Sequence, residues 1–252
     1  MPPKTIAIAT HKGGTGKTVT TMALGSALAH AGKRTLIIDL DPQGHSTLGL
    51  GVDVPENAFT LRDLFTEPPQ PIARVILPTH KDRLSIVPSD IRLERVAQLI
   101  YMRPRREDIL KRALQPILGE YDFVLVDCPP SLGALTETGI TAADFVIVPC
   151  QMEARAADGL VDLLEVLAIL KGENFEAWRI LLTKVDPRKT VTNEAVRAAL
   201  SRWQDKIFEI SIPQSEPLNQ AQIERTDIFS FDPKGKGALA YEALSRELLN
   251  HV

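Results

Sequence analysis

Short apolar runs alternate along the chain with longer segments whose apolar positions recur at helical spacing. The runs are rich in Val, Ile and Leu without polar alternation, which predicts strands buried on both faces of a parallel sheet. Together the two patterns predict an α/β fold, a single doubly wound, mostly parallel sheet with helices on both faces. The predicted strands are residues 5–10, 35–39, 84–88, 123–127, 145–149, 179–183 and 208–212, and the predicted helices are 19–31, 59–65, 93–100, 106–118, 157–170, 192–203 and 238–249.

Composition agrees with one globular domain over residues 1–252, since 44% of the residues are hydrophobic and 24% are charged. No apolar run approaches the ~18–20 residues that a membrane span needs, and Met1–Lys4 lead into no secretory-signal pattern. Cys128 and Cys150 are too few for a disulfide framework, so a cytoplasmic protein is expected. The formal charge of −3 disfavours a broadly basic nucleic-acid coat, so DNA binding would need a local patch.

A glycine-rich loop follows the first predicted strand and opens the first predicted helix. Glycines let backbone N–H groups converge on phosphate oxygens, and the helix N-terminus adds a positive dipole. Lys17 would hold the β- and γ-phosphates of a nucleotide, and the Thr18 hydroxyl would ligate Mg²⁺. His11 stands where the Gly-x-x-x-x-Gly-Lys-[Ser/Thr] pattern has its first glycine; the rest of the pattern is intact.

Lys12 places a second lysine at the start of this loop. Its side chain cannot easily fold back onto phosphates already held by Lys17, but in a dimer it could cross to the partner's nucleotide as an arginine finger does. A solvated surface charge is the alternative. With this lysine the loop resembles that of the deviant Walker-A ATPases, specifically the ParA/Soj-type partition ATPases of the MinD/ParA superfamily of P-loop NTPases, whose loop reads Lys-Gly-Gly-x-Gly-Lys-[Ser/Thr].

Two acidic residues, Asp39 and Asp41, lie at the end of the second predicted strand, in Asp-Leu-Asp-Pro-Gln-Gly. Ligands in open α/β sheets bind at the carboxyl edge, so both should face the phosphate site, although an ordinary turn fits the same residues. The family resemblance implies that Asp41 positions the attacking water and that Asp39 supports the Mg²⁺ shell. It also implies that Asp127, which ends the 123–127 strand, holds the metal through water.

The resemblance covers nearly the whole chain, including the segments 148–153, 182–186, 212–213 and 231–241. It implies an ATP-dependent homodimer and a loop along adenine that opens at Pro213. The residues that it assigns to ATP are Lys12, Gly13, Gly14, Thr15, Gly16, Lys17, Thr18, Val19 and Pro213; the catalytic residues are Lys12, Lys17 and Asp41; the metal residues are Thr18, Asp39 and Asp127.

The DNA-binding surface of the family cannot be copied onto this chain, because two of its arginines are replaced by Gln214 and Pro217. Residues 179–252 hold 11 Lys and Arg against 10 Asp and Glu, so no strong basic surface stands out. Each remaining basic cluster, including a second one at residues 103–112, could also be a solvated face. The remaining candidates for DNA contact are Arg188, Lys189, Arg225, Lys234 and Lys236.

The leading hypothesis is a nucleoid-associated partition or positioning ATPase without a membrane partner or an N-terminal helix-turn-helix extension. ATP would close a dimer that binds DNA non-specifically, and a ParB-type adaptor on the cargo would stimulate its weak hydrolysis. A MinD-like membrane-associated regulator is the alternative, but residues 240–252 hold one arginine and two glutamates rather than a basic amphipathic helix. A third class is a metabolic or electron-transfer relative. A nitrogenase-iron-protein-like ATPase would need two cluster-binding cysteines at set positions, which Cys128 and Cys150 do not fit, and a bacterial tyrosine kinase would need a C-terminal tyrosine cluster, where only Tyr241 is present.

Overall fold

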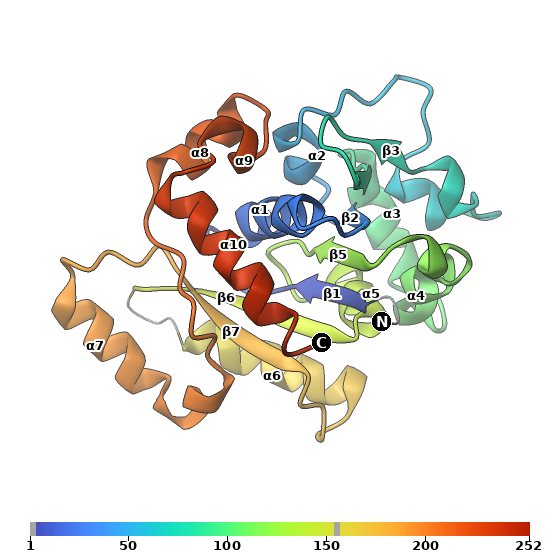
Figure 1. Ribbon diagram of the computed structural model, residues 1–252. Coiled ribbons are helices and arrows are strands. Elements are labelled where there is room, and N and C mark those ends of the chain that lie inside the picture. The colour runs from blue at the N-terminus through green and yellow to red at the C-terminus, as the bar shows by residue number, and fades with distance from the viewer. Residues whose placement is uncertain (1–3, 154–156) are drawn as a thin grey trace.

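Seven strands form one sheet in the order β3-β4-β2-β5-β1-β6-β7 (Figure 1) in the computed structural model, which describes residues 4–153 and 157–252. Neighbouring strands are parallel, except that β3 runs antiparallel to β4 at the edge. The strands are β1 (Lys4–Ile8), β2 (Thr35–Asp39), β3 (Leu77–Pro78), β4 (Leu84–Val87), β5 (Phe123–Asp127), β6 (Phe145–Gln151) and β7 (Trp178–Thr183).

Helices cover both faces of the sheet (Figure 1). The α-helices are α1 (Lys17–His30), α2 (His45–Gly49), α3 (Arg92–Ile100), α4 (Ile109–Leu114), α5 (Ala134–Ala142), α6 (Asp158–Lys171), α7 (Thr190–Ala199), α8 (Glu216–Ile223), α9 (Ile228–Phe231) and α10 (Lys236–Leu248). The short 3₁₀ helices are η1 (Leu61–Leu64), η2 (Ile72–Arg74), η3 (Arg106–Asp108), η4 (Gln115–Glu120) and η5 (Ser201–Lys206).

Alternate residues of each strand serve two separate cores. In β2, Ile37 belongs to the core that includes residues of α1, α8, α9 and α10, whereas Leu36 and Ile38 belong to the core that includes residues of α3, α4, α5 and α6. Side chains on a strand alternate between faces, so a sheet covered on both sides needs apolar residues at every position. This arrangement confirms the predicted doubly wound, mostly parallel sheet.

The predicted strand over 208–212 is wrong, because these residues form no ladder with β7. Phe208 N and Ile212 N donate to β7 carbonyls, but the N–H groups of Glu209 and Ile210 donate to the carboxylate of Glu247 on α10 instead (2.7 and 3.0 Å). Pairing at this edge is therefore reduced to isolated bridges.

Helix α5 was not predicted, since its sequence, Ala-Leu-Thr-Glu-Thr-Gly-Ile-Thr-Ala, combines three threonines with a glycine. Gly139 lets this helix approach the sheet closely, because a Cβ there would lie 2.9 Å from Cys128 Sγ and 3.0 Å from Leu40 Cδ2.

The predicted 106–118 helix is instead the succession η3, α4 and η4, with Pro116 near the start of η4. No secretory signal was expected at the start of the chain, and of that segment Met1–Pro3 lie outside the described residues.

The fold brings three loops to the carboxyl ends of the central strands. Residues 9–16 follow β1, residues 40–44 follow β2, and residues 128–133 follow β5. Because β1, β2 and β5 are neighbours in the sheet, these loops meet at one edge.

Candidate functional site

The glycine-rich loop between β1 and α1 has the backbone conformation for which its glycines are required. Gly14 and Gly16 have φ values of 76° and 94°, in the region that other residues rarely adopt. Gly16 is also the residue that precedes α1, and no side chain caps the N-terminus of this helix. The first N–H groups of the helix thus remain available to an anion beside the loop.

Lys17, the first residue of α1, is nearly buried beneath this loop, with 7% of its surface exposed. Its Nζ donates to the carbonyl of Lys12 at 3.1 Å. Burial lowers the pKa of Lys17, and the nearby charge of Asp127 partly offsets this effect. A second ammonium, that of Lys184 after β7, donates to the carbonyl of Gly14 at 2.7 Å. Lys184 was not assigned to the site from the sequence, because it lies 170 residues away in the chain.

Two buried carboxyl groups stand side by side next to the loop. Asp39 ends β2 and Asp127 ends β5, and the two residues are partners in the parallel register of these strands. Burial raises the pKa of Asp39, and the charge of Asp127 raises it further. Burial likewise raises the pKa of Asp127, against the lowering effect of hydrogen bonds from Ser46 and Thr18. Such a pair favours a bound cation, which would remove the mutual repulsion.

Hydroxyl groups of α2 orient these two acids. Ser46 Oγ donates to Asp127 Oδ2 (2.7 Å), and Thr47 donates to Asp39 Oδ2 through both its Oγ1 (2.7 Å) and its backbone N (2.8 Å). Neither residue was assigned to the site from the sequence. Their position just after Asp-Pro-Gln-Gly could have indicated that they belong to the site, because residues separated from β2 by a short loop must lie near the carboxyl edge of the sheet. Asp39 Oδ1 is buried without a hydrogen-bond partner among the described residues, so this oxygen is free to face a ligand.

Asp41 lies at the mouth of the same site and is 8% exposed. Its Oδ1 accepts a hydrogen bond from the backbone N of Gln43 (3.0 Å), which fixes the carboxylate in the turn. Asp41 also lines a surface hollow of about 720 Å³ together with Pro129 and Pro130, which follow β5. The structure thus brings all three predicted acids to one edge of the sheet.

Lys12 is the predicted site residue whose side chain lies apart from the others. Its Nζ forms an ion pair with Glu153, just after β6, and the side chain is 40% exposed. The neighbouring His11 is likewise tied to this side of the molecule, with its Nδ1 2.8 Å from Asp162 Oδ2 on α6. The ammonium of Lys12 is therefore directed toward the surface beside the loop, whereas that of Lys17 lies beneath it.

A small cavity of about 140 Å³ opens beside the glycine-rich loop. Gly16 and Val19 line one side, and Pro213 and Thr183 line another, so the cavity joins residues from both ends of the chain. Thr183 Oγ1 donates to the carbonyl of Thr15 at 2.7 Å, which fixes the cavity to the loop. The two residues predicted outside the loop itself, Val19 and Pro213, thus share this cavity.

The five residues predicted for DNA contact fall into two groups. Arg188 is paired with Asp186 at 2.8 Å, and Arg225 is paired with Asp53 at 2.5 Å. Within the described part of the chain, the other three, Lys189, Lys234 and Lys236, form no ion pair. The three lysines therefore differ from the two arginines in carrying no partner charge among the described residues.

The comparisons with known proteins agree on the family of this chain. A model of the AAA_31 family, described as an AAA domain, matches residues 3–177. The sporulation initiation inhibitor protein Soj of Bacillus subtilis is 34% identical over 248 residues, which cover 97% of this chain and 98% of Soj. The chromosome partitioning protein ParA of Caulobacter vibrioides is 35% identical over 254 residues, with 99% and 95% coverage.

A solved structure extends the agreement to three dimensions. The cobyrinic acid a,c-diamide synthase of Mycobacterium smegmatis, with bound ATP analogue and magnesium, matches with a TM-score of 0.84 and 32% identity over 99% of this chain and 95% of that one. Fold and site together define a P-loop ATPase whose cofactors are ATP and Mg²⁺. More narrowly, the chain belongs to the ParA/Soj family of ATPases, of the ParA/MinD type.

Proposed function

We propose that this chain is an ATP-dependent switch that dimerises on ATP, binds DNA non-specifically, and segregates or positions a cargo. The observation that carries the proposal is the side chain of Lys12, which is paired with Glu153 at the surface rather than placed over its own loop. A cation at the rim of one phosphate site is within reach of a second copy that meets this edge. There it would neutralise charge on the partner's nucleotide, as an arginine finger does.

The residues of the site fit Mg²⁺ and a triphosphate. The glycine-rich loop and the uncapped start of α1 offer backbone N–H groups, and Asp39 Oδ1 is a buried acceptor without a partner among the described residues. Thr18, Asp39 and Asp127 would hold the metal or its waters, and Lys17 would exchange its bond to a backbone carbonyl for one to phosphate. Bound Mg²⁺ supplies charge neutralisation at the β- and γ-phosphates. Asp41 would orient the attacking water and accept its hydrogen bond.

The surface beside Asp41 supports dimerisation at this edge. The hollow of about 720 Å³ that Asp41 lines also includes Tyr101 and Met102, at the end of α3. Their exposures are 57% and 85%, which is high for large apolar side chains. A second copy that covers this surface would bury them and exclude water from the nucleotide at the same time.

DNA binding and partner action complete the proposed cycle. Lys189, Lys234 and Lys236 would contact DNA phosphates, and a dimer would double their number, which matters because non-specific binding rises steeply with the number of contacts. A ParB-type adaptor on a plasmid, chromosome or protein assembly would stimulate the weak hydrolysis and release the dimer. Residence in the cytoplasm, on the nucleoid, would follow from this DNA binding.

The MinD-like alternative has less support in the described residues, because the apolar face of helix α10 is already engaged. Helix α10 lies beside α1 (Figure 1). Tyr241, Leu244 and Leu248 are buried in the core that also contains residues of α1, so this apolar face is not offered to a lipid surface. Within residues 4–153 and 157–252, no helix is both long enough and apolar enough to cross a bilayer.

Dimer formation by the Asp41→Ala variant tests the proposal, because this change should retain ATP while blocking its hydrolysis. Light scattering should find a dimer with ATP and Mg²⁺ and a monomer with ADP, and a column of non-specific duplex DNA should retain only the ATP form. Adding Lys12→Ala should abolish both results. An ATP-bound form that stays monomeric at high concentration, or equal DNA retention with ATP and ADP, would refute the switch.

A further inference from the structure

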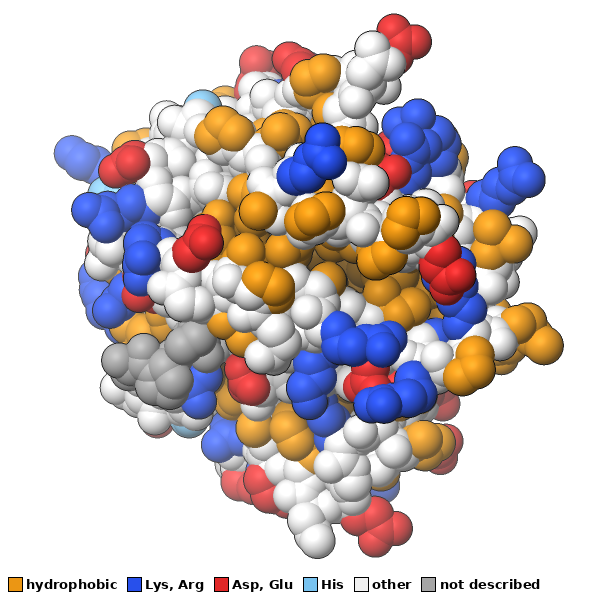
Figure 2. Space-filling view, turned by 90° about the vertical axis from the view of Figure 1, so that its right-hand side faces the viewer, with side chains coloured by type: hydrophobic (Ala, Val, Ile, Leu, Met, Phe, Trp, Pro, Cys, Tyr) orange, Lys and Arg blue, Asp and Glu red, His pale blue; other side chains and the backbone are white. Residues whose placement is uncertain are grey.

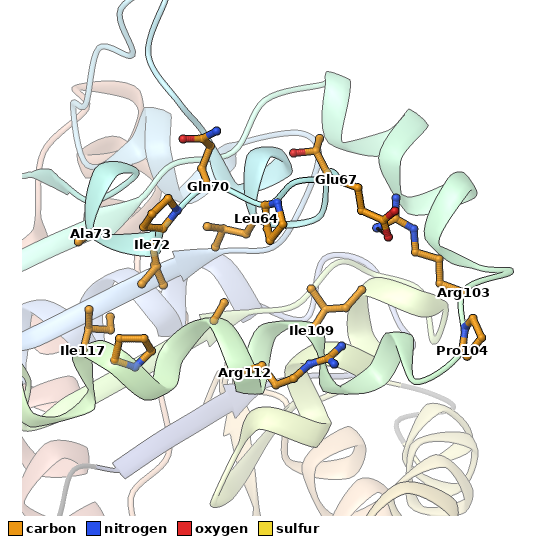
Figure 3. Close-up of a pocket in the computed structure, with 15 residues that line it drawn as sticks. Leu64, Glu67, Gln70, Ile72, Ala73, Arg103, Pro104, Ile109, Arg112 and Ile117 are labelled. Carbon is orange, nitrogen blue, oxygen red and sulfur yellow. Dashed lines mark ion pairs between the residues drawn. The ribbon is translucent and has the colours of Figure 1, made fainter.

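A separate groove of about 570 Å³ lies between the segment 64–73 and helix α4, remote in the chain from the glycine-rich loop. Its floor is made by Leu64, Ile72 and Ile117, each no more than 3% exposed and part of the hydrophobic core. Figure 3 shows these side chains together with prolines of both walls. Figure 2 shows the same side of the molecule as a surface, with an apolar hollow whose border carries both basic and acidic side chains.

One end of the groove is cationic. Arg103 and Arg112 both lie there, while Ile72 and Ile117 lie at the other end (Figure 3). Arg103 donates to the carbonyl of Phe65 at 2.8 Å and lies 3.3 Å from Glu67, but Glu67 is 75% exposed, so solvent weakens this pair. Arg112 has no ion pair or hydrogen bond to any residue in the described ranges. The groove therefore presents an uncompensated positive charge beside an apolar surface.

This arrangement is unlike the nucleotide site and unlike a phosphate-backbone surface. No residue that lines the groove also lines the cavity beside the glycine-rich loop or the hollow beside Asp41. DNA surfaces are strongly basic and polar, whereas most of the lining here is proline, isoleucine, leucine and alanine. The chemistry that complements it is an apolar surface with a carboxylate at one end.

We propose that this groove binds a peptide segment of a protein partner in which apolar side chains adjoin an Asp or Glu. The apolar side chains fill the space over Leu64, Ile72 and Ile117, and the carboxylate meets Arg112. A volume of about 570 Å³ accommodates a few such side chains. The docking goes beyond the ATP switch, because no part of it requires nucleotide.

Selection from a displayed library of random 12-residue peptides on the nucleotide-free wild-type chain tests this proposal. The enriched peptides should combine at least two apolar residues with a neighbouring Asp or Glu. Arg112→Glu should weaken their binding by about tenfold or more, because an attraction is replaced by a repulsion. Ala73→Trp, at an exposed residue of the groove wall, should block the peptides by filling the space without changing any charge.

Lys111→Glu is the matched control, because Lys111 is the exposed neighbour of Arg112 on α4 but does not line the groove. This variant should bind the peptides within about twofold of wild type, and circular dichroism should show that all three variants are folded. No enrichment, enriched peptides that are basic, or peptides that bind Arg112→Glu and Ala73→Trp as well as wild type would each overturn the proposal. Because no ATP is present, failure here leaves the dimerisation test of the switch unaffected.

Discussion

The ion pair between Lys12 and Glu153 opposes the dimer that we propose, because Lys12 must leave Glu153 to reach a second nucleotide. Glu153→Gln should therefore strengthen ATP-dependent dimerisation. Both side chains are about 40% exposed, so the pair contributes only about 0.2–1 kcal/mol per protomer. Two pairs break per dimer, which gives about 0.4–2 kcal/mol and a dissociation constant lower by about 2-fold to 30-fold.

The assay is sedimentation of the Asp41→Ala chain in ATP and Mg²⁺, with and without Glu153→Gln, over a range of protein concentrations. The gain should shrink at high salt, because partly exposed charges are screened. It should vanish when Lys12 is alanine, since the pair no longer exists. Asp162→Asn is the matched control: Asp162 contacts His11 on the same surface but not Lys12. A weaker dimer with Glu153→Gln would refute the reasoning, since Glu153 would then support Lys12 in the dimer.

Two further predictions concern the buried part of the site. The pKa values of Asp39 and Asp127 are raised in the ligand-free fold, to about 8 for Asp39, so the folded chain retains protons that the unfolded chain has lost. The stability that these protonated acids contribute is fully present below about pH 4 and is lost as the pH rises through 8. Because a cation binds the ionised carboxylates, Mg²⁺ and ATP should raise the melting temperature more at pH 8 than at pH 6. Asp39→Asn should reduce this difference between the two pH values. Gly139→Ala should lower the free energy of unfolding by about 1–3 kcal/mol in urea, because the added Cβ meets Cys128 Sγ at 2.9 Å. Gly119→Ala, with nothing within 4 Å of the added Cβ, should change it by less than about 0.5 kcal/mol, and equal losses would contradict the packing argument.

The central sheet was predictable because its strands are uniformly apolar and bounded by loops with clear turn residues. Strand β5 ends at Asp127 as expected, and its partner acid Asp39 follows from the same rule that ligands meet the carboxyl edge. Local periodicity failed where distant contacts decide the structure. Glu247 diverts the backbone at Glu209 and Ile210 from the sheet edge, and nothing near residue 209 in the sequence announces it.

The site was predictable where one loop carries it and less so where several segments meet. The glycine-rich loop is continuous, so its residues could be named directly, whereas Lys184 joins the site only through the fold. The ion pair of Lys12 with Glu153 likewise joins residues far apart in the chain. The groove beside Arg112 had no signal beyond a basic cluster, because its apolar floor comes from residues that by pattern belong to the core.

The hydrogen bond between Thr20 and Tyr241, at 3.0 Å, joins residues 221 positions apart, and Tyr241 also lines the cavity beside the glycine-rich loop. The cavity therefore cannot be complete during synthesis until residue 241 has left the ribosome. A product of translation that stops before this residue would carry the glycine-rich loop yet lack one wall of the cavity.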